Sequence, residues 1–169
     1  ACTYGELATC VQKISSLFKD REDKIIGIVA ENRLETYASI LSALICGKAY
    51  VILHPSYPKH RNDRIAGLAG IRLVLHTKNI HVLNLDTRNL ELICTSEIEQ
   101  AENSATFHAA EDILHTAEEE NAYIIFTSGS TGEPKGVPIS RRNLNAFYTA
   151  YHRLGWQLDE NDRMLQMFE

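Results

Sequence analysis

The order of apolar and polar residues along the chain predicts helices that alternate with short buried strands. Apolar residues recur at helical spacing in three stretches, so helices are expected at 3–18, 33–46 and 58–69. Short apolar runs lie between and after them, and strands are expected at 24–30, 49–53, 71–75 and 81–85. This alternation is typical of parallel β–α–β units. We therefore predict an α/β fold with a doubly wound, mostly parallel sheet flanked by helices.

Residues that start and stop helices support this assignment. Thr3 and Glu6 have the spacing of a capping box, in which each side chain accepts a hydrogen bond from the other residue's backbone N–H. Asn32 is a candidate cap for the second helix, and Pro58 is favoured at the first position of the third. Gly70 follows that helix, where glycine commonly ends a helix.

Between a strand expected at 123–126 and another at 137–139, the chain changes abruptly from apolar residues to hydroxyls and glycines. Lys135 adds one fixed positive charge, and charge-assisted hydrogen bonds are roughly twice as strong as neutral ones. Glycines allow positive φ and let backbone N–H groups approach an anion; they are Gly129, Gly132 and Gly136. Hydroxyls can donate to phosphate oxygens, and the candidates are Thr127, Ser128, Ser130 and Thr131. The loop therefore suits a polyphosphate.

A solvated surface turn would have a similar composition, because Gly, Ser, Thr and Pro are the usual turn residues. The loop is not a Walker loop, which requires Gly-Lys-Ser/Thr at the start of a helix, whereas Lys135 lies between Pro134 and Gly136. The order of residues from Thr127 to Gly136 instead resembles the phosphate-loop signature of the adenylate-forming superfamily. That signature is roughly Thr/Ser-Ser/Thr-Gly-Ser/Thr-Thr-Gly-x-Pro-Lys-Gly, and every position is matched. Acyl-CoA synthetases, luciferases and nonribosomal peptide synthetase adenylation domains are its members.

Two further stretches resemble conserved elements of adenylation domains. Residues 3–7 are similar to the first such element, and residues 45–61 to the second. Ile52 and His54 stand where the family usually has proline and aspartate, and we expect neither change to remove phosphate binding, because this element is mainly structural in the family. The order of residues 55–58, Pro-Ser-Tyr-Pro, favours the branch that activates amino acids.

The resemblance implies an ATP-dependent ligase. A carboxylate, in this branch an amino acid, attacks the α-phosphate of ATP to give an acyl-adenylate and pyrophosphate. A phosphopantetheine thiol on a carrier protein then takes the acyl group. Lys135 is the implied catalytic residue, and a Mg²⁺ ligand is expected outside this fragment. The resemblance assigns ATP binding to Thr127, Ser128, Gly129, Ser130, Thr131, Gly132, Lys135 and Gly136.

The extent of the resemblance bears on domain organisation. It covers residues 3–169, including 159–168, which is similar to the strand before the family's substrate pocket; in the family this is about the first third of the enzyme. We expect residues 1–169 to be a fragment of the N-terminal AMP-binding domain, without the C-terminal domain and inactive alone. The parent would be a nonribosomal peptide synthetase module or a D-alanine–carrier-protein ligase. The alternatives are an acyl-CoA synthetase and a non-catalytic nucleotide-binding or carrier-docking module.

A last helix is expected at 141–154, with Ser140 as its cap. Arg141 and Arg142 in its first turn oppose the helix dipole, and one hypothesis places them near the phosphates. The apolar positions of this helix form an aromatic stripe, which is typical of a core-facing surface; they are Leu144, Phe147, Tyr148, Tyr151 and Leu154. The stretch 91–121 is the least informative part of the chain.

Composition adds limits to these expectations. The 169 residues carry a formal charge of −5 and are 44% hydrophobic, a mixed balance that argues against a nucleic-acid binder. No apolar run approaches the ~20 residues of a membrane span and no signal peptide is visible, so no membrane partner is expected. The four cysteines have no metal or redox spacing, which favours a reduced, cytoplasmic setting. His108 and Asp112 are four residues apart, but no second pair completes a zinc site, and we predict no metal site.

Overall fold

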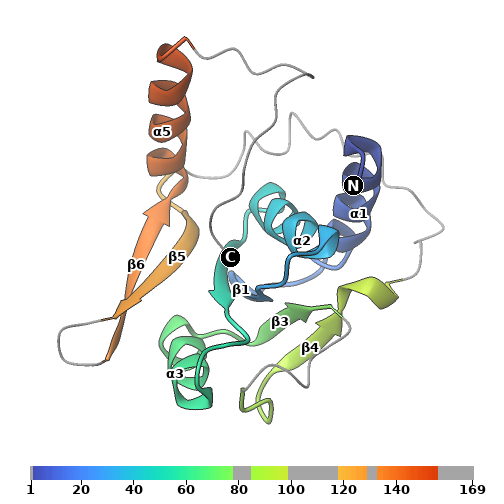
Figure 1. The fold of residues 1–169 in the computed structure, drawn as a ribbon, viewed down its shortest axis with the longest axis vertical. Helices are drawn as coiled ribbons and strands as arrows, with labels where there is room; N and C mark the ends of the chain where they lie inside the picture. Colours follow the sequence, from blue (N-terminus) through green and yellow to red (C-terminus); the bar gives the residue numbers. More distant parts are fainter. Residues whose placement is uncertain (1, 78–84, 99–117, 129–132, 156–169) are drawn as a thin grey trace.

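The computed structural model describes residues 2–77, 85–98, 118–128 and 133–155 (Figure 1). Its strands form one six-stranded sheet in the order β4-β3-β1-β2-β5-β6. Neighbouring strands are parallel except for β5 and β6, which are antiparallel. The strands are β1 (Ile25–Val29), β2 (Ala49–Leu53), β3 (Leu73–His76), β4 (Glu91–Cys94), β5 (Asn121–Ser128) and β6 (Pro134–Ser140). The predicted mostly parallel sheet is confirmed.

The described α-helices are α1 (Tyr4–Ser16), α2 (Leu34–Ile45), α3 (Lys59–Ala69) and α5 (Arg141–Arg153), and a short 3₁₀ helix, η2 (Thr95–Glu97), follows β4. The capping box of α1 is confirmed, because Thr3 Oγ1 accepts from the Glu6 amide at 3.2 Å and Glu6 accepts from the Thr3 amide at 2.7 Å. Gly70 ends α3 with a φ of 66°. The expected cap at Asn32 is wrong, since its side chain instead accepts a hydrogen bond from the hydroxyl of Tyr37.

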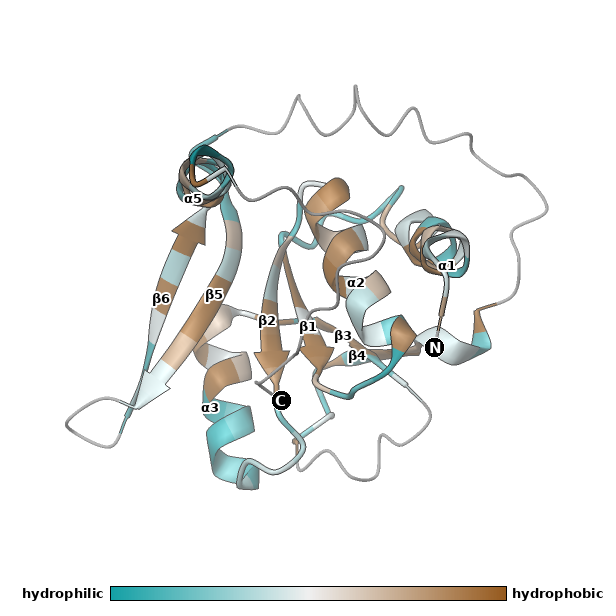
Figure 2. Cartoon of the chain, turned by 45° about the horizontal axis from the view of Figure 1, so that its top comes forward, coloured by the Kyte–Doolittle hydropathy of each residue, from teal (hydrophilic) through white to brown (hydrophobic). Residues whose placement is uncertain are grey.

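The helices cover both faces of the parallel strands, as Figure 2 shows. On one face, Ile26 and Ile28 of β1 pack with Ile14 of α1 and Ala38 of α2. On the opposite face, the core gathers residues from β1, β2, β3 and α3, among them Val29, Val51, Leu53, Ile65 and Val74. Burial on both faces explains why β1 is almost entirely apolar. The doubly wound arrangement that the alternation predicted is therefore confirmed.

Strand β4 is an edge strand that the sequence did not predict. Only three of its residues, Leu92 to Cys94, are apolar, which is too short a run to distinguish from a loop. Its pairing with β3 begins at Leu73 and Glu91, and Arg21 donates to both carboxylate oxygens of Glu91. Of the strand expected at 81–85, only Leu85 is described, and it is buried but not in a strand. The stretch 159–168 also lies outside the described residues.

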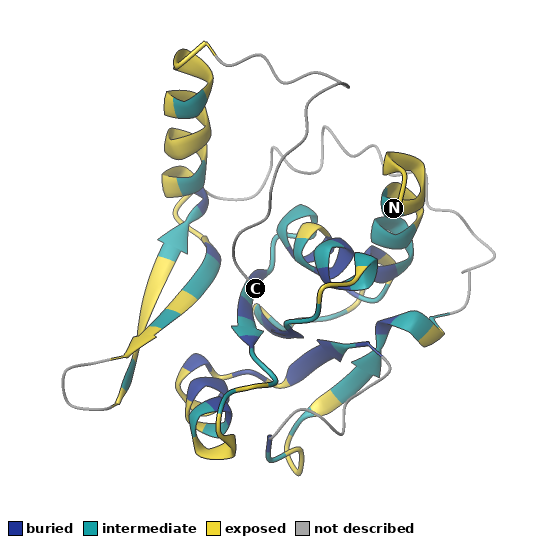
Figure 3. Ribbon diagram, in the orientation of Figure 1, coloured by how far each residue is buried: buried dark blue, intermediate teal, exposed yellow. Residues whose placement is uncertain are grey.

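Helix α5 stands at the base of the β5–β6 hairpin, on the side away from α1 and α3 (Figure 1). The expected burial of its aromatic stripe is wrong in the structure, because Phe147, Tyr148 and Leu154 are 63%, 53% and 65% exposed. Figure 3 shows the contrast with the buried strands of the sheet. The spacing identified an amphipathic helix correctly, but it does not say which element covers the apolar face.

Candidate functional site

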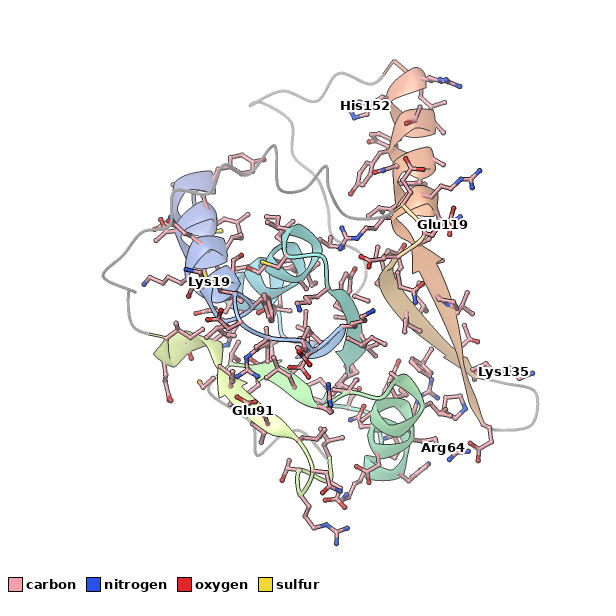
Figure 4. All side chains as sticks on the ribbon, turned by 180° about the vertical axis from the view of Figure 1, so that it is seen from behind. Lys19, Arg64, Glu91, Glu119, Lys135 and His152 are labelled. Atoms are coloured by element: carbon pink, nitrogen blue, oxygen red, sulfur yellow. The ribbon has the colours of Figure 1, made fainter. Side chains whose placement is uncertain are left out.

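The β5–β6 hairpin carries the described residues that the sequence assigns to phosphate binding. Strand β5 is apolar from Ala122 to Phe126 and ends in Thr127 and Ser128, and β6 begins at Pro134. The antiparallel register places Thr127 opposite Lys135 and Ser128 opposite Pro134. Lys135 therefore lies in a strand, although the sequence placed it in the loop before one. Figure 4 shows its side chain near the outer end of the hairpin, pointing away from it.

The side chains around Lys135 are able to bind an anion. Lys135 is exposed, and among the described residues its ammonium group has no hydrogen-bond or ion-pair partner. The hydroxyl of Thr127 lies 3.5 Å from the carbonyl oxygen of Lys135, a long contact that a stronger acceptor would readily replace. Ser128 is also exposed. The Thr127 hydroxyl and the Lys135 ammonium group, opposite each other across the hairpin, are donors that fit a phosphate group of ATP.

Gly136 has a packing role that the sequence does not reveal. It lies in β6 opposite Phe126, and positive φ angles occur only at Gly47, Gly70 and Gly155 among the described residues. A Cβ at position 136 would lie 3.1 Å from Cζ of Phe126. The Phe126 ring therefore lies close to the space that a side chain at position 136 would occupy. Gly136 does not use the positive φ that glycine allows, and its assignment to ATP stays a prediction.

The remaining loop residues, Gly129, Ser130, Thr131 and Gly132, lie outside the described residues, so their assignment to ATP also stays a prediction.

Arg141 and Arg142 lie at the base of the hairpin and contact other groups. The buried guanidinium of Arg141 donates to the carbonyl oxygen of Leu44 at 2.9 Å and to that of Lys48 at 3.3 Å. Arg142 pairs with Glu119 at 3.3 Å. The hypothesis that places these arginines near the phosphates is wrong, because both are held at the end of the hairpin opposite to the loop.

The hairpin joins the parallel sheet through a small contact. Tyr50 of β2 and Tyr123 of β5 are the described register partners between these strands, and their rings stack with centroids 5.4 Å apart. Burial raises the pKa of Tyr50 to about 12, and the nearby hydroxyls of Tyr123 and Tyr148 act in the same direction. The Tyr50 hydroxyl is therefore uncharged at neutral pH.

A second contact, between α3 and the hairpin, lies at the loop end of the hairpin. The sequence alone does not reveal it. Arg64 of α3 pairs with Glu133 at 2.8 Å from Nε to Oε2. Glu133 is the unspecified position of the phosphate-loop pattern, two residues before Lys135. No spacing rule connects residues 69 positions apart.

Membrane-spanning helices and metal-binding clusters are both absent from the described ranges. No helix there is long and apolar enough to cross a membrane. No group of three or more His, Cys, Asp or Glu side chains there is placed to hold a metal ion.

Comparison with known proteins relates this chain to peptide synthetases. The chain is 32% identical over 171 residues to tyrocidine synthase 3 of Brevibacillus parabrevis, covering 97% of the chain and 2% of that protein. It is 30% identical over 173 residues to gramicidin S synthase 2 of Brevibacillus brevis, covering 98% of the chain and 4% of that protein. The chain thus spans only a small fraction of the length of these relatives.

Solved structures with the same fold include nonribosomal peptide synthetases. The α-methyl-L-serine-AMP bound form of FmoA3 matches 89% of this chain and 16% of its own, with a TM-score of 0.73 and 25% identity. The N-terminal subdomain of Klebsiella oxytoca NpsA shares the fold over 83% of this chain and 36% of its own, with a TM-score of 0.62 and 21% identity. The AMP-binding enzyme family matches residues 1–169. The chain therefore belongs to the AMP-binding enzymes, the adenylate-forming superfamily that its phosphate-loop signature indicated.

Proposed function

We propose that the protein containing this chain activates a carboxylate with ATP as an acyl-adenylate and passes the acyl group to a phosphopantetheine thiol on a carrier protein. The observation that carries the proposal is the pairing of Thr127 with Lys135 across the hairpin, in a chain of the AMP-binding family. An amino acid is the preferred carboxylate, which is supported by the likeness to FmoA3 in its α-methyl-L-serine-AMP bound form.

The described residues have a defined task in this reaction. As the carboxylate oxygen forms a bond to the α-phosphorus, the bond from phosphorus to the bridging oxygen breaks and negative charge moves onto the departing pyrophosphate. Thr127 and Ser128 donate hydrogen bonds to phosphate oxygens, and Lys135 supplies a positive charge. Fixed donors stabilise charge that develops in the transition state more than charge already present in the substrate. A bound Mg²⁺ ion would neutralise further phosphate charge.

ATP–pyrophosphate exchange tests this function in the protein that contains the chain. Panels of amino acids, aryl acids and fatty acids are offered separately. Exchange that depends on one amino acid supports the proposal and identifies the substrate. Exchange that depends on a fatty acid would favour an acyl-CoA synthetase, and no exchange by a folded protein with any acid would favour a non-catalytic nucleotide-binding or carrier-docking module.

Replacing Lys135 tests the role of the site. Lys135→Ala should lower the exchange rate at least about tenfold, because removing one donor from a comparable site costs ~10²–10³-fold in kcat. The thermal unfolding midpoint should not change, since the side chain is exposed and its ammonium group has no hydrogen-bond or ion-pair partner among the described residues. Lys19→Ala is the matched control, because Lys19 is an exposed lysine on the far side of the sheet from the hairpin (Figure 4). An unchanged exchange rate in Lys135→Ala would remove Lys135 from the mechanism.

A further inference from the structure

The outer half of the β5–β6 hairpin depends on α3 for its position. Among the described residues, Tyr123 is the one register partner that β5 has in β2, so the backbone ladder of the parallel sheet does not extend to residues 124–128. Ile124 and Phe126 pack against the core cluster to which α3 contributes Ile65 and the parallel strands contribute Val51 and Leu53. Figures 1 and 4 show the loop end of the hairpin beside this helix.

The ion pair between Arg64 and Glu133 lies at the end of that contact. Ser128 and Pro134 form the last register pair among the described residues of the hairpin, and Pro134 has no backbone N–H to donate to a ladder. Within the described part of the chain, the Arg64 guanidinium is the side-chain partner of Glu133. The charged contact therefore lies next to the last described pair of the backbone ladder.

Arg64 is the α3 cation that pairs with the hairpin. Lys59 pairs with Asp63 on the same helix at 2.7 Å, and the Arg61 guanidinium lies 4.5 Å from the ring centre of Tyr57. Both neighbouring cations therefore have partners close to their own helix. Of these three cations, only Arg64 makes an ion pair with the hairpin in the described structure.

We propose that Arg64 is a positioning residue. Its ion pair holds Glu133 against α3 and thereby sets where the start of β6 presents Lys135 to phosphate. This inference rests on the proposed function, because it concerns the same hairpin and the same ATP phosphates. Lys135 follows Glu133 by two residues, and Thr127 faces it across the strands. Loss of the pair would leave Lys135 charged but less often in the position that meets ATP.

The test measures ATP–pyrophosphate exchange in the protein that contains the chain, with kcat and the KM for ATP determined separately. Arg64→Glu should raise the KM for ATP about fivefold, which corresponds to the upper end of the free energy of an exposed ion pair. Glu133→Gln should raise it about threefold. The exchanged pair, R64E with E133R, should return the KM to within about twofold of the starting protein. In all three variants the KM for the carboxylate should change less than twofold, and kcat should fall by less than it does in Lys135→Ala, because Lys135 also acts in the transition state.

Controls separate positioning from general damage. Lys59→Glu breaks the Lys59–Asp63 pair with the same reversal of charge on the same helix and should leave the KM for ATP unchanged. A variant that merely lowers the amount of folded protein would reduce kcat and leave KM constant. In a Lys135→Ala background, Arg64→Glu should have no further effect on KM, because a positioning residue acts through the group it positions.

The outcomes distinguish this inference from the proposed function. If Lys135→Ala lowers exchange while Arg64→Glu and Glu133→Gln leave the KM for ATP unchanged, the positioning role is wrong and the proposed function stands. The same conclusion follows if the exchanged pair retains the KM of Arg64→Glu alone. If Lys135→Ala has no effect on exchange, the assignment of the site fails first, and the positioning role fails with it.

Discussion

Gly27, in the middle of β1, is required by the packing around it. A Cβ built at this position would lie 3.1 Å from methyl groups of Ile71 and Val74 and 3.2 Å from one of Leu53. All three neighbours are buried, so they can move only by disturbing the core beneath α3. We expect Gly27→Ala to lower the free energy of unfolding by about 1–3 kcal/mol, the usual cost of overpacking, as measured by urea unfolding of the protein.

Gly67→Ala is the matched control for that substitution. Gly67 lies in α3, and a Cβ there would have no atom within 4 Å. Alanine is favoured over glycine by about 0.5–1 kcal/mol in the interior of a helix, so the free energy of unfolding should rise by that amount. Equal effects of the two substitutions, in either direction, would contradict the packing argument.

For single residues, the sequence revealed a role only where the residues that share the role are contiguous in the chain. The stretch from Thr127 to Gly136 was recognisable because its order is a continuous pattern, and the register then placed Thr127 beside Lys135 as a hairpin would. The contact between Gly136 and Phe126 was hidden, because a glycine in a phosphate loop is already explained by the close approach of the backbone to an anion. The pairing of Arg64 with Glu133 was also hidden, since only the fold brings α3 to the end of β6.

Arg141 connects α5 to α2, and its contribution to stability can be measured. Its buried guanidinium donates to the carbonyl oxygens of Leu44 and Lys48, at the C-terminus of α2, where a positive charge also interacts favourably with the helix dipole. We expect Arg141→Met to lower the free energy of unfolding by about 1.5–3 kcal/mol, the range for hydrogen bonds to charged groups. Methionine keeps most of the side-chain volume, so the measured loss reports on the polar contacts. Urea unfolding gives the value.

Arg142→Met provides the comparison for Arg141. Arg142 is the next residue and makes an exposed ion pair with Glu119, with side chains 69% and 81% accessible. Exposed pairs contribute about 0–1 kcal/mol, so this substitution should have a much smaller effect. If Arg142→Met costs as much as Arg141→Met, burial is not what makes Arg141 important.

Elements with strong local signals were predictable from the sequence, and those defined by their neighbours were not. The helix α1 has its capping box, α3 ends before Gly70, and α5 has Ser140 as its N-terminal cap. The edge strand β4 has no comparable signal, because pairing with β3 and the contact of Glu91 with Arg21 define it. Periodicity found the apolar face of α5 but could not report its exposure, which depends on what lies against it.

For the whole molecule, the central feature is that one sheet is built in two parts. The parallel strands β1 to β4 are covered by helices on both faces. The β5–β6 hairpin has one described register pair with them, the stacked Tyr50 and Tyr123, and otherwise meets their core through side chains such as Ile124 and Phe126. Arg141 reinforces the base of the hairpin, and Arg64 reinforces its loop end. The position of Lys135 relative to the parallel core is therefore set by a few side chains and not by an extensive backbone ladder.

The pH dependence of unfolding should report on the Tyr50 junction. Because burial raises the pKa of Tyr50 to about 12 in the folded protein, the unfolded chain releases this proton first, near the ordinary tyrosine pKa of ~10. The contribution of the neutral Tyr50 hydroxyl to the free energy of unfolding is fully present below about pH 10 and is lost as the pH rises towards 12. Tyr50→Phe keeps the ring and removes the ionisable group, so the fall in unfolding free energy between about pH 9 and 11.5 should be shallower than in the unchanged protein. Tyr4→Phe, at a residue 91% exposed, should follow the original curve; coincident curves for all three proteins would mean that Tyr50 is not held neutral at the junction.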